Sequence, residues 1–306
     1  STGNRMKSRL LFAILSASVG VAWGQSKALV FQSDFGVRDG AVSAMKGVAY
    51  SVSSDLHIFD LTHEIPAFDI REASIRLSQA APFWPAGTVF VSVVDPGVGS
   101  ERKSIVMKSK TGHYFVTPDN GTLTTVAEAM GVGEVREIDE SRNRRPQSGD
   151  SHTFHGRDIY SFTGARLAAG IISFEEVGPV LTSDLVLLDK EKPIFDKGII
   201  YGTIEILDIQ YGNVWTNIGR KWIEQLTLNP GDSVHVRIWS GKKKVFEDSV
   251  VFASTFADVP VNSNVAYLNS LHRFSLAVNQ GSFARRYNIK SGPGWTIQVA
   301  RPNPSK

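Results

Sequence analysis

The fold is decided by one stretch, Thr88-Val89-Phe90-Val91-Ser92-Val93-Val94-Asp95-Pro96-Gly97-Val98-Gly99-Ser100-Glu101-Arg102. Its apolar first half predicts a buried strand, and the Pro and Gly residues after Asp95 predict a tight turn. Such a turn directs the Asp95 carboxylate out of the carboxyl edge of a sheet, where open α/β sheets bind their ligands. Arg102 follows seven residues later, close enough to return to the same place. The alternative is an Asp that only begins a well-formed turn.

Predicted strands and helices alternate on both sides of this stretch, from Lys27 to about Val180. Alternation of this kind predicts α/β layers, here a Rossmann-like domain over residues 26–185. The predicted strands are 28–31, 56–60, 88–94, 105–107 and 114–116, the last two forming a hairpin, and the predicted helices are 40–51, 69–80, 123–130 and 158–169. The Arg-, Asn- and Ser-rich segment 139–151 is interpreted as an exposed loop.

A charged segment with Pro193, residues 189–197, is interpreted as a linker. Beyond it the sequence changes to short β runs separated by turns, at 198–207, 234–239, 245–252, 265–268 and 295–299. Short strands of this kind predict a smaller β-barrel domain over residues 195–303, with a β-sandwich as the alternative. The predicted fold class is therefore α/β, with a C-terminal β-barrel.

Composition places the chain among globular proteins, since 42% of its 306 residues are hydrophobic and 21% are charged. The sequence pI of about 9.0 suggests a nucleic-acid partner at first sight. However, residues 1–24 contain Arg5, Lys7 and Arg9 and no acidic residue, so their removal takes the net charge from +3 to zero. A neutral protein gives no electrostatic reason to bind nucleic acid, and none is expected.

Residues 1–24 have the pattern of an export signal, with possible extra residues before Met6. A basic start is followed by an apolar run from Leu10 to Val21 and by small residues at Ala22 and Gly24. We therefore expect an exported, periplasmic protein that is not held at a membrane after the signal is removed. The chain has no cysteine, which excludes disulfides, thiolate chemistry and Cys-ligated metal.

Polar residues gather at the predicted strand ends and loops, which converge on one crevice in an α/β fold. They are Asp34, Asp39, Asp60 with His63, Asp95 with Arg102, Asp119-Asn120-Gly121, and His155-Gly156-Arg157-Asp158. Most have a structural alternative: a turn for 119–121, a helix cap for Asp158, a core position for His63. The combination of Asp, Arg and His on loops is the hardest to explain by structure alone.

Several common motifs are missing from the sequence. There is no phosphate-binding P-loop, no dinucleotide Gly-x-Gly-x-x-Gly, no nucleophile elbow and no zinc-binding His-Glu-x-x-His. Pro and Gly residues accompany the carboxylates, and this spacing indicates turns that orient side chains and does not indicate a set of metal ligands. No metal site and no cofactor are expected.

Seven segments with characteristic residues occur in order along the chain. They are Ser33-Asp34-Phe35-Gly36, Met45-Lys46-Gly47, Thr62-His63, Val94-Asp95-Pro96-Gly97-Val98-Gly99, Pro118-Asp119-Asn120-Gly121, Thr153-Phe154-His155-Gly156-Arg157-Asp158 and Tyr211-Gly212-Asn213-Val214-Trp215-Thr216-Asn217-Ile218. Together they resemble the S-adenosyl-L-methionine (SAM) hydrolases that form adenosine, also called SAM hydroxide adenosyltransferases, which are related to fluorinase and chlorinase. The resemblance extends over about residues 28–299.

This resemblance implies attack of water on the ribose C5′ of SAM, giving adenosine and methionine. The family's water-handling triad falls on Asp95, Arg102 and His155. The halogenating relatives have Tyr in place of the Asp, lack the His-Gly pair and carry an insertion after the turn. This chain keeps Asp95 and His155-Gly156 and has no such insertion, which favours water over halide.

Similarity to the family also implies a set of substrate contacts. Asp34 would accept from the ribose diol, Phe68 and Trp215 would lie near the ribose and adenine, and Asn213 near the adenine edge. Asp208 would meet the methionine ammonium and Ser270 its carboxylate, while Asp39 and Phe154 complete the set. The sequence departs from the family at His272, where the family has Gly, at Leu271, where the halogenases have Arg, and in Asp208-Ile209-Gln210-Tyr211.

The resemblance further implies a homotrimer, with each site between the first domain of one subunit and the second domain of its neighbour. An export signal conflicts with a substrate that is made in the cytoplasm. Two alternatives to SAM hydrolysis therefore stay open: hydrolysis of another 5′-substituted adenosine, and an exported protein that binds such compounds without turnover.

Overall fold

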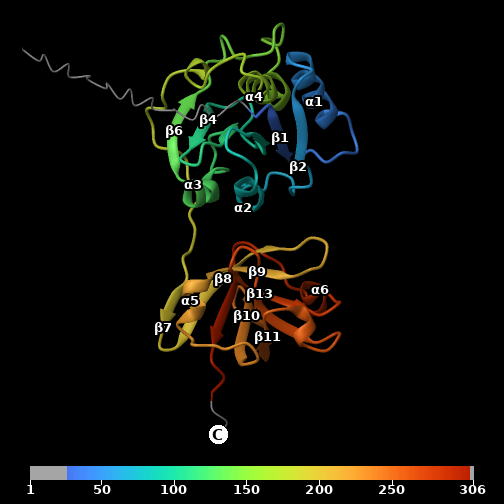
Figure 1. The fold of residues 1–306 in the computed structure, drawn as a ribbon, viewed down its shortest axis with the longest axis vertical. Helices are drawn as coiled ribbons and strands as arrows, with labels where there is room; N and C mark the ends of the chain where they lie inside the picture. The colour runs from blue at the N-terminus through green and yellow to red at the C-terminus, as the bar shows by residue number, and fades with distance from the viewer. Residues whose placement is uncertain (1–25, 304–306) are drawn as a thin grey trace, which may run out of the picture.

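The computed structural model describes residues 26–303, which form an α/β domain and a β-barrel joined by one connecting segment (Figure 1). The α/β domain has a six-stranded sheet in the order β2-β1-β3-β5-β4-β6. Its strands are β1 (Ala28–Ser33), β2 (His57–Thr62), β3 (Val89–Val93), β4 (Ser104–Ser109), β5 (Tyr114–Pro118) and β6 (Val132–Glu137). The first four in this order run parallel, whereas β4 is antiparallel to both of its neighbours.

Helices cover both faces of this sheet, so the central strands are buried on both sides and consist of continuous apolar runs. Figure 1 shows α2 and α3 on the side that faces the barrel, and α1 and α4 on the other side. The helices are α1 (Ala41–Val52), α2 (Ile70–Ala80), α3 (Thr124–Met130) and α4 (Phe162–Ala168), the last preceded by a π-helical segment, η2 (Gly156–Ser161). Short 3-10 turns follow α2 and α4, at Ala81–Phe83 and Glu175–Val177.

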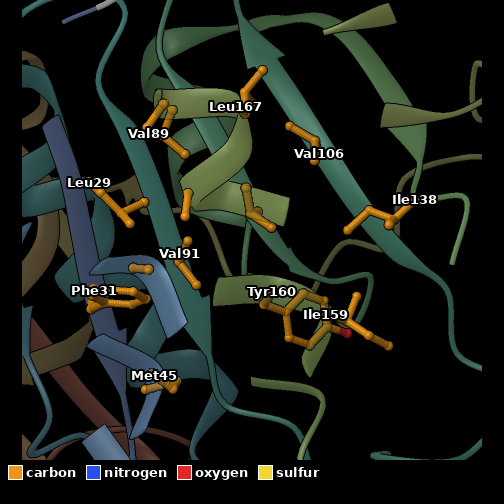
Figure 2. Close-up of a cluster of buried hydrophobic side chains, with 14 of the residues drawn as sticks. Leu29, Phe31, Met45, Val89, Val91, Val106, Ile138, Ile159, Tyr160 and Leu167 are labelled. Carbon is orange, nitrogen blue, oxygen red and sulfur yellow. The ribbon is translucent and has the colours of Figure 1, made fainter. Parts of the chain in front are cut away.

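The larger core of the α/β domain lies between the sheet and the layer of α1, η2 and α4. Alternate residues of β1 and β3, such as Leu29, Phe31 and Val91, point into it, together with Met45 and Tyr160, and all five are fully buried (Figure 2). Full burial of an aliphatic or aromatic side chain contributes about 1.5–3 kcal/mol to folding. This core fixes the ends of β1 and β3 relative to η2.

The second domain is a closed barrel of seven strands in the order β14-β10-β11-β12-β13-β9-β8, closed by pairing of β8 with β14. Only β11 and β12 pair in parallel, and β7 extends the sheet beyond β8. The strands are β7 (Ile194–Asp196), β8 (Ile199–Leu207), β9 (Val214–Gly219), β10 (Ser233–Ser240), β11 (Lys243–Phe252), β12 (Asn264–Leu268), β13 (Arg273–Val278) and β14 (Trp295–Ala300), with short helices α5 (Arg220–Glu224), α6 (Phe283–Tyr287) and η4 (Phe256–Asp258).

Two arginines on α2 connect the domains. Arg71 donates to the carbonyl of Glu205, and Arg76 donates to the carbonyl of Leu207 at 2.7 Å, both near the end of β8. The connecting segment is also held, because the Val186 amide donates to the carboxylate of Asp119 at 3.0 Å. The motif at 119–121 therefore has a structural role in this chain.

The predicted α/β class and barrel are confirmed, as are the predicted strands and helices within a few residues of their ends. Four strands were not predicted: β6, β7, β9 and β13, of which β7 lies in the segment interpreted as a linker. The prediction of an exposed loop at 139–151 is wrong in part, since Asn143 and Ser148 are buried. The predicted export signal, residues 1–24, lies outside the described residues. Within residues 26–303, no helix has the length and apolar character needed to span a membrane.

Candidate active site

The order of the strands places a ligand crevice at the carboxyl ends of β1 and β3. The chain goes from β1 to β2 on one side and later returns to β3 on the other, so the two strands flank a topological switch point, where α/β folds bind ligands. Ser33 and Asp34 lie at the end of β1, and Asp95 lies just beyond β3. The predicted position of Asp95 at this sheet edge is thus confirmed.

A compact turn follows Asp95 and brings Arg102 back toward it. The amide of Val98 donates to the Asp95 carbonyl at 3.2 Å, and Gly99 has a φ of 76°. A Cβ on Gly97 would lie 3.2 Å from Cγ of Arg102. Glycine at position 97 therefore leaves the space through which the Arg102 side chain folds back.

Arg102 joins the three predicted triad residues. Its Nε donates to Asp95 Oδ1 at 2.8 Å and its Nη2 to Asp95 Oδ2 at 2.5 Å, a bidentate ion pair. The same Nη2 lies 2.9 Å from His155 Nδ1. The side chains of Arg102 and Asp95 are only 11% and 6% exposed, so this network is largely shielded from bulk water.

His155 reaches the network because the residue after it is glycine. A Cβ on Gly156 would lie 3.1 Å from Val93 Cγ1 and 3.2 Å from Met45 Sδ, tighter than most such contacts. The first turn of η2 therefore packs directly on the end of β3 and on α1. The His-Gly pair is a geometric requirement for placing an imidazole beside Asp95.

The donors around His155 fix its protonation state. A guanidinium can only donate, so His155 Nδ1 must offer its lone pair to Arg102, and the single proton of the neutral ring is on Nε2. Burial of the imidazole, followed by the positive charge of Arg102, lowers the pKa of His155 from its usual value of 6.5. Glu140 and Asp95 oppose this shift, and Arg144 adds to it. His155 is therefore neutral at pH 7.

Two buried side chains that the sequence did not single out hold Arg102 in place. Its Nη1 donates to Ser104 Oγ at 3.1 Å, and Ser104 Oγ lies 2.9 Å from the hydroxyl of Tyr160. The guanidinium also lies over the Tyr160 ring, 5.6 Å from its centroid. Burial opposes the charge on Arg102, but the hydrogen bonds to Asp95, together with electrostatic interactions with Tyr160, Asp95 and Glu140, outweigh it and raise the pKa of Arg102.

The basic loop 139–151 packs against η2 instead of extending into solvent. Arg145 donates from Nε to Asp158 Oδ1 at 2.8 Å, and Arg157 binds both oxygens of the same carboxylate. Asp158 is fully buried, so it anchors the loop and does not merely cap a helix. Arg144 is thereby brought to 3.5 Å from His155 Nε2. Since that nitrogen carries the proton, Arg144 acts on His155 through its charge.

The α/β domain also carries four of the residues expected to bind substrate. Asp34 accepts from the Phe68 amide at 2.9 Å, which holds Phe68 at a φ of 66° with its ring 70% exposed. The ring of Phe154 packs edge-on against Phe35 at 5.7 Å. Asp39 is exposed and accepts from the amide of Ala41, at the start of α1.

The other four expected residues lie on the barrel. Asp208 and Trp215 line a cavity of about 300 Å³ that also includes Glu64 and Arg76. Asn213 lines another of about 600 Å³, and Ser270 is exposed. Within residues 26–303, no hydrogen bond or ion pair connects these four with Asp95, Arg102 or His155.

The turn that carries Ser270 explains one departure from the family pattern. His272 has a φ of 59°, a conformation that favours glycine, and the family has Gly there. The turn is held by Asn269, whose Oδ1 accepts from the amides of Leu271 and Arg273. The backbone shape is thus kept without the glycine.

The site offers a carboxylate, a guanidinium and a neutral imidazole around one point, which suits the orientation and deprotonation of water. In the described part of the chain, no group of three or more His, Asp or Glu side chains is arranged to hold a metal ion. The fold and the site together define a two-domain enzyme with a preorganised polar triad at the edge of an α/β sheet.

Comparison with known proteins identifies the family. Residues 29–178 match the SAM hydroxide adenosyltransferase N-terminal domain, and residues 202–296 match the C-terminal domain of the same family. The chain therefore belongs to the SAM hydroxide adenosyltransferase family.

Individual relatives agree with this assignment. An (R)-S-adenosyl-L-methionine hydrolase from Methanocaldococcus jannaschii is 37% identical over 214 residues, 69% of this chain and 73% of the relative. A fluorinase from Nocardia brasiliensis is 30% identical over 302 residues, 90% of this chain and 98% of its own. The crystal structure of an uncharacterized conserved protein from Thermotoga maritima matches with a TM-score of 0.82 and 37% identity, covering 89% of this chain and all of that one.

The protonation state of His155 predicts the pH dependence of the enzyme. Because the neutral ring is needed to accept from Arg102 and its pKa is lowered, the midpoint of the acid limb of kcat/KM should lie below pH 6.5. Replacement of Arg144 by Gln removes one of the charges that disfavour imidazolium, so the acid limb should move to higher pH. An acid limb with its midpoint above pH 6.5, or one that moves to lower pH in R144Q, would contradict this assignment.

Proposed function

We propose that this protein hydrolyses SAM to adenosine and methionine by attack of water on the ribose C5′. The oxygen of water forms the new bond to C5′, the C5′–S bond breaks, and methionine leaves with the electron pair as a neutral thioether. One proton of water is released. Since the sulfonium needs no protonation to leave, the protein has to supply only a positioned water and an acceptor for its proton. The reaction needs no metal or cofactor on this account.

Asp95 is the proton acceptor in this proposal. His155 Nδ1 already accepts from Arg102, so its only free group is the Nε2–H, which can donate but not accept. Each oxygen of Asp95 accepts one hydrogen bond from Arg102 and keeps a second lone pair for water. Arg102 stabilises negative charge that develops on the attacking oxygen, and His155 keeps Arg102 and the water in line.

The hydrogen bonds of Arg102 to both Asp95 and His155 are the observation that supports this function most directly. They support a water site formed by an acid, a cation and an imidazole, in a chain whose relatives include proteins named (R)-S-adenosyl-L-methionine hydrolase. Asp at position 95 favours water as the nucleophile, whereas the resemblance associates halide with Tyr.

Purified protein incubated with SAM in ¹⁸O-water should give adenosine labelled at the 5′-hydroxyl, detected by mass spectrometry. The Asp95→Ala variant should lower kcat by about 10²–10⁴-fold, the usual contribution of a general base. Asp150→Asn, which changes an exposed carboxylate of the 139–151 loop, is the matched control and should keep full activity. Unlabelled adenosine, or tight adenosine binding without turnover, would reject hydrolysis and favour a binding protein. Faster turnover of another 5′-substituted adenosine would change the substrate but keep the mechanism.

We also propose a homotrimer in which the barrel of a neighbouring subunit completes each site. Two features support this arrangement. The barrel residues that are expected to bind substrate form no hydrogen bond or ion pair with the triad of the same chain. In addition, large apolar side chains are exposed beside the part of the site on each domain. Phe68 is 70% exposed next to Asp34, and Ile209 and Tyr211 are 71% and 66% exposed next to Asp208.

Mixed oligomers test this arrangement. Asp95→Ala and Asp208→Ala impair opposite halves of the site, so co-expression of the two should restore about a quarter of the sites by random pairing. The separate variants should stay inactive when they are simply mixed without subunit exchange. Monomers in analytical ultracentrifugation, or co-assembled trimers without recovered activity, would contradict a shared site.

Export to the periplasm is part of the proposal, because the basic start and the apolar run of residues 1–24 are typical of an export signal. Cell fractionation with mass spectrometry of the amino terminus should find the protein outside the cytoplasm, beginning near Gln25. Cytoplasmic protein that keeps residues 1–24 would overturn it.

A further inference from the structure

Two segments that carry the family resemblance, Met45-Lys46-Gly47 and Thr62-His63, have no part in the chemistry described above. The structure connects them in one chain of short hydrogen bonds. Lys46 Nζ lies 2.6 Å from Asp60 Oδ2, Asp60 Oδ1 lies 2.7 Å from His63 Nε2, and His63 Nδ1 lies 2.7 Å from Ser33 Oγ. The chain runs from a half-exposed lysine to a serine that is fully buried.

The chemistry of these groups sets the direction of the two bonds to Asp60. An ionised carboxylate only accepts, so Lys46 and His63 Nε2 both donate hydrogen bonds to Asp60. Burial opposes ionisation of Asp60, but the hydrogen bonds and positive charges of Lys46 and His63 outweigh it and lower its pKa. The other ring nitrogen of His63, Nδ1, is hydrogen-bonded to the hydroxyl of Ser33. The Ser33 oxygen also accepts from the amide of Phe35, at 3.2 Å.

This chain ends on the turn that carries Asp34. The side chain of His63 holds Ser33, and its carbonyl accepts from the amide of Gly36 at 2.7 Å, so His63 is bonded on both sides of Asp34. β1 and β2 are parallel neighbours, which brings their carboxyl ends together. His63 is 4% exposed and has no access to substrate. Any effect it has on the reaction must therefore be indirect, and the turn that carries Asp34 is the part of the site to which it is bonded.

A Ser–His–Asp arrangement also suggests a nucleophilic serine, but the geometry excludes this role. Ser33 is 0% exposed and lies within the hydrogen-bonded end of β1, so no substrate atom can approach its oxygen. That oxygen accepts from a backbone amide, which reduces its nucleophilicity. The arrangement is suited to hold a turn.

We propose that His63 is a positioning residue for recognition of the ribose diol: through Ser33 it fixes the turn that directs the Asp34 carboxylate at the two ribose hydroxyls. Lys46 and Asp60 extend this support to the surface of α1 and β2. The inference rests on the proposed function in one respect, the contact between Asp34 and the diol. It assigns to His63 a role in the discrimination between ribose and 2′-deoxyribose substrates, which is separate from the deprotonation of water by Asp95.

The test measures discrimination between ribose and 2′-deoxyribose. In the parent protein, loss of one hydroxyl bonded to a carboxylate should weaken binding about 10–100-fold, so adenosine should bind that much more tightly than 2′-deoxyadenosine in calorimetry. Ser33→Ala removes only the hydroxyl, and it should reduce this ratio to near one. His63→Ala should do the same, and His63→Asn, which restores an acceptor near Ser33, should recover part of the ratio. With SAM, these variants should raise KM more than they lower kcat.

Two controls separate the possible outcomes. His57→Ala changes an exposed histidine at the start of β2, the strand that leads to His63, and should leave the ratio and the activity unchanged. Asp34→Asn should abolish the ratio, and thermal unfolding checks that each variant is folded. If Ser33→Ala and His63→Ala keep the parent ratio, or weaken both nucleosides equally, the positioning role is overturned. If Asp34→Asn keeps it, the diol contact is absent and the inference also fails. Because nucleoside binding needs no turnover, a protein that fails to hydrolyse SAM would refute the proposed function and leave this test intact.

Discussion

The active site depends on one arginine that can only donate hydrogen bonds. Arg102 uses its Nε and Nη2 on Asp95, shares Nη2 with His155 and places Nη1 on Ser104. Because a guanidinium has no lone pair to offer, each of these partners must accept. Asp95 therefore accepts with both of its oxygens, and His155 must be neutral with its proton on Nε2. The arginine thus decides which group can take a proton from water, and that group is Asp95.

The rest of the α/β domain serves to hold this arginine and its acceptors. β3 ends at Asp95, Gly97 leaves room for the return of Arg102, and Gly156 lets η2 pack against the end of β3. Ser104 and Tyr160 add a polar and an aromatic contact to the guanidinium. Preorganisation of this kind removes the need to reorient groups during the reaction, which is a large part of enzymatic rate enhancement.

Much of the architecture could be predicted because it follows from local patterns. The apolar run before Asp95 and the Pro–Gly turn after it gave the strand, the turn and the position at the sheet edge. The strands β6, β7, β9 and β13 were missed for different reasons. β6 includes Gly133 and three charged residues, and β7 lies within the charged segment interpreted as a linker. β9 and β13 mix polar with apolar residues although both are largely buried, because Thr216, Asn217 and Ser275 form hydrogen bonds inside the barrel. These segments form strands because they pair with strands that are distant in the sequence.

The sequence predicted which residues form the site, but not the hydrogen bonds between them. Ordered motifs placed Asp95, Arg102 and His155 in one family pattern, but the bonds that set their protonation depend on contacts across 50 or so residues, such as Arg102 with His155. The support from Ser104 and Tyr160, and the approach of Arg144, have no signal in the sequence because Ser, Tyr and Arg are common on strands, helices and loops. The basic loop was interpreted as exposed because its composition is polar, whereas buried Asp158 gives its arginines a partner.

The protonation of His155 tests the central claim most directly. Nitrogen NMR of protein labelled with ¹⁵N-histidine, with His155 assigned by the loss of its signals in His155→Gln, distinguishes the two neutral tautomers and the imidazolium. At pH 7 the account predicts a neutral ring with hydrogen on Nε2 and an unprotonated Nδ1. Hydrogen on Nδ1, or a doubly protonated ring at that pH, would mean that Arg102 does not donate to His155, and would contradict the assignment of Asp95 as the proton acceptor.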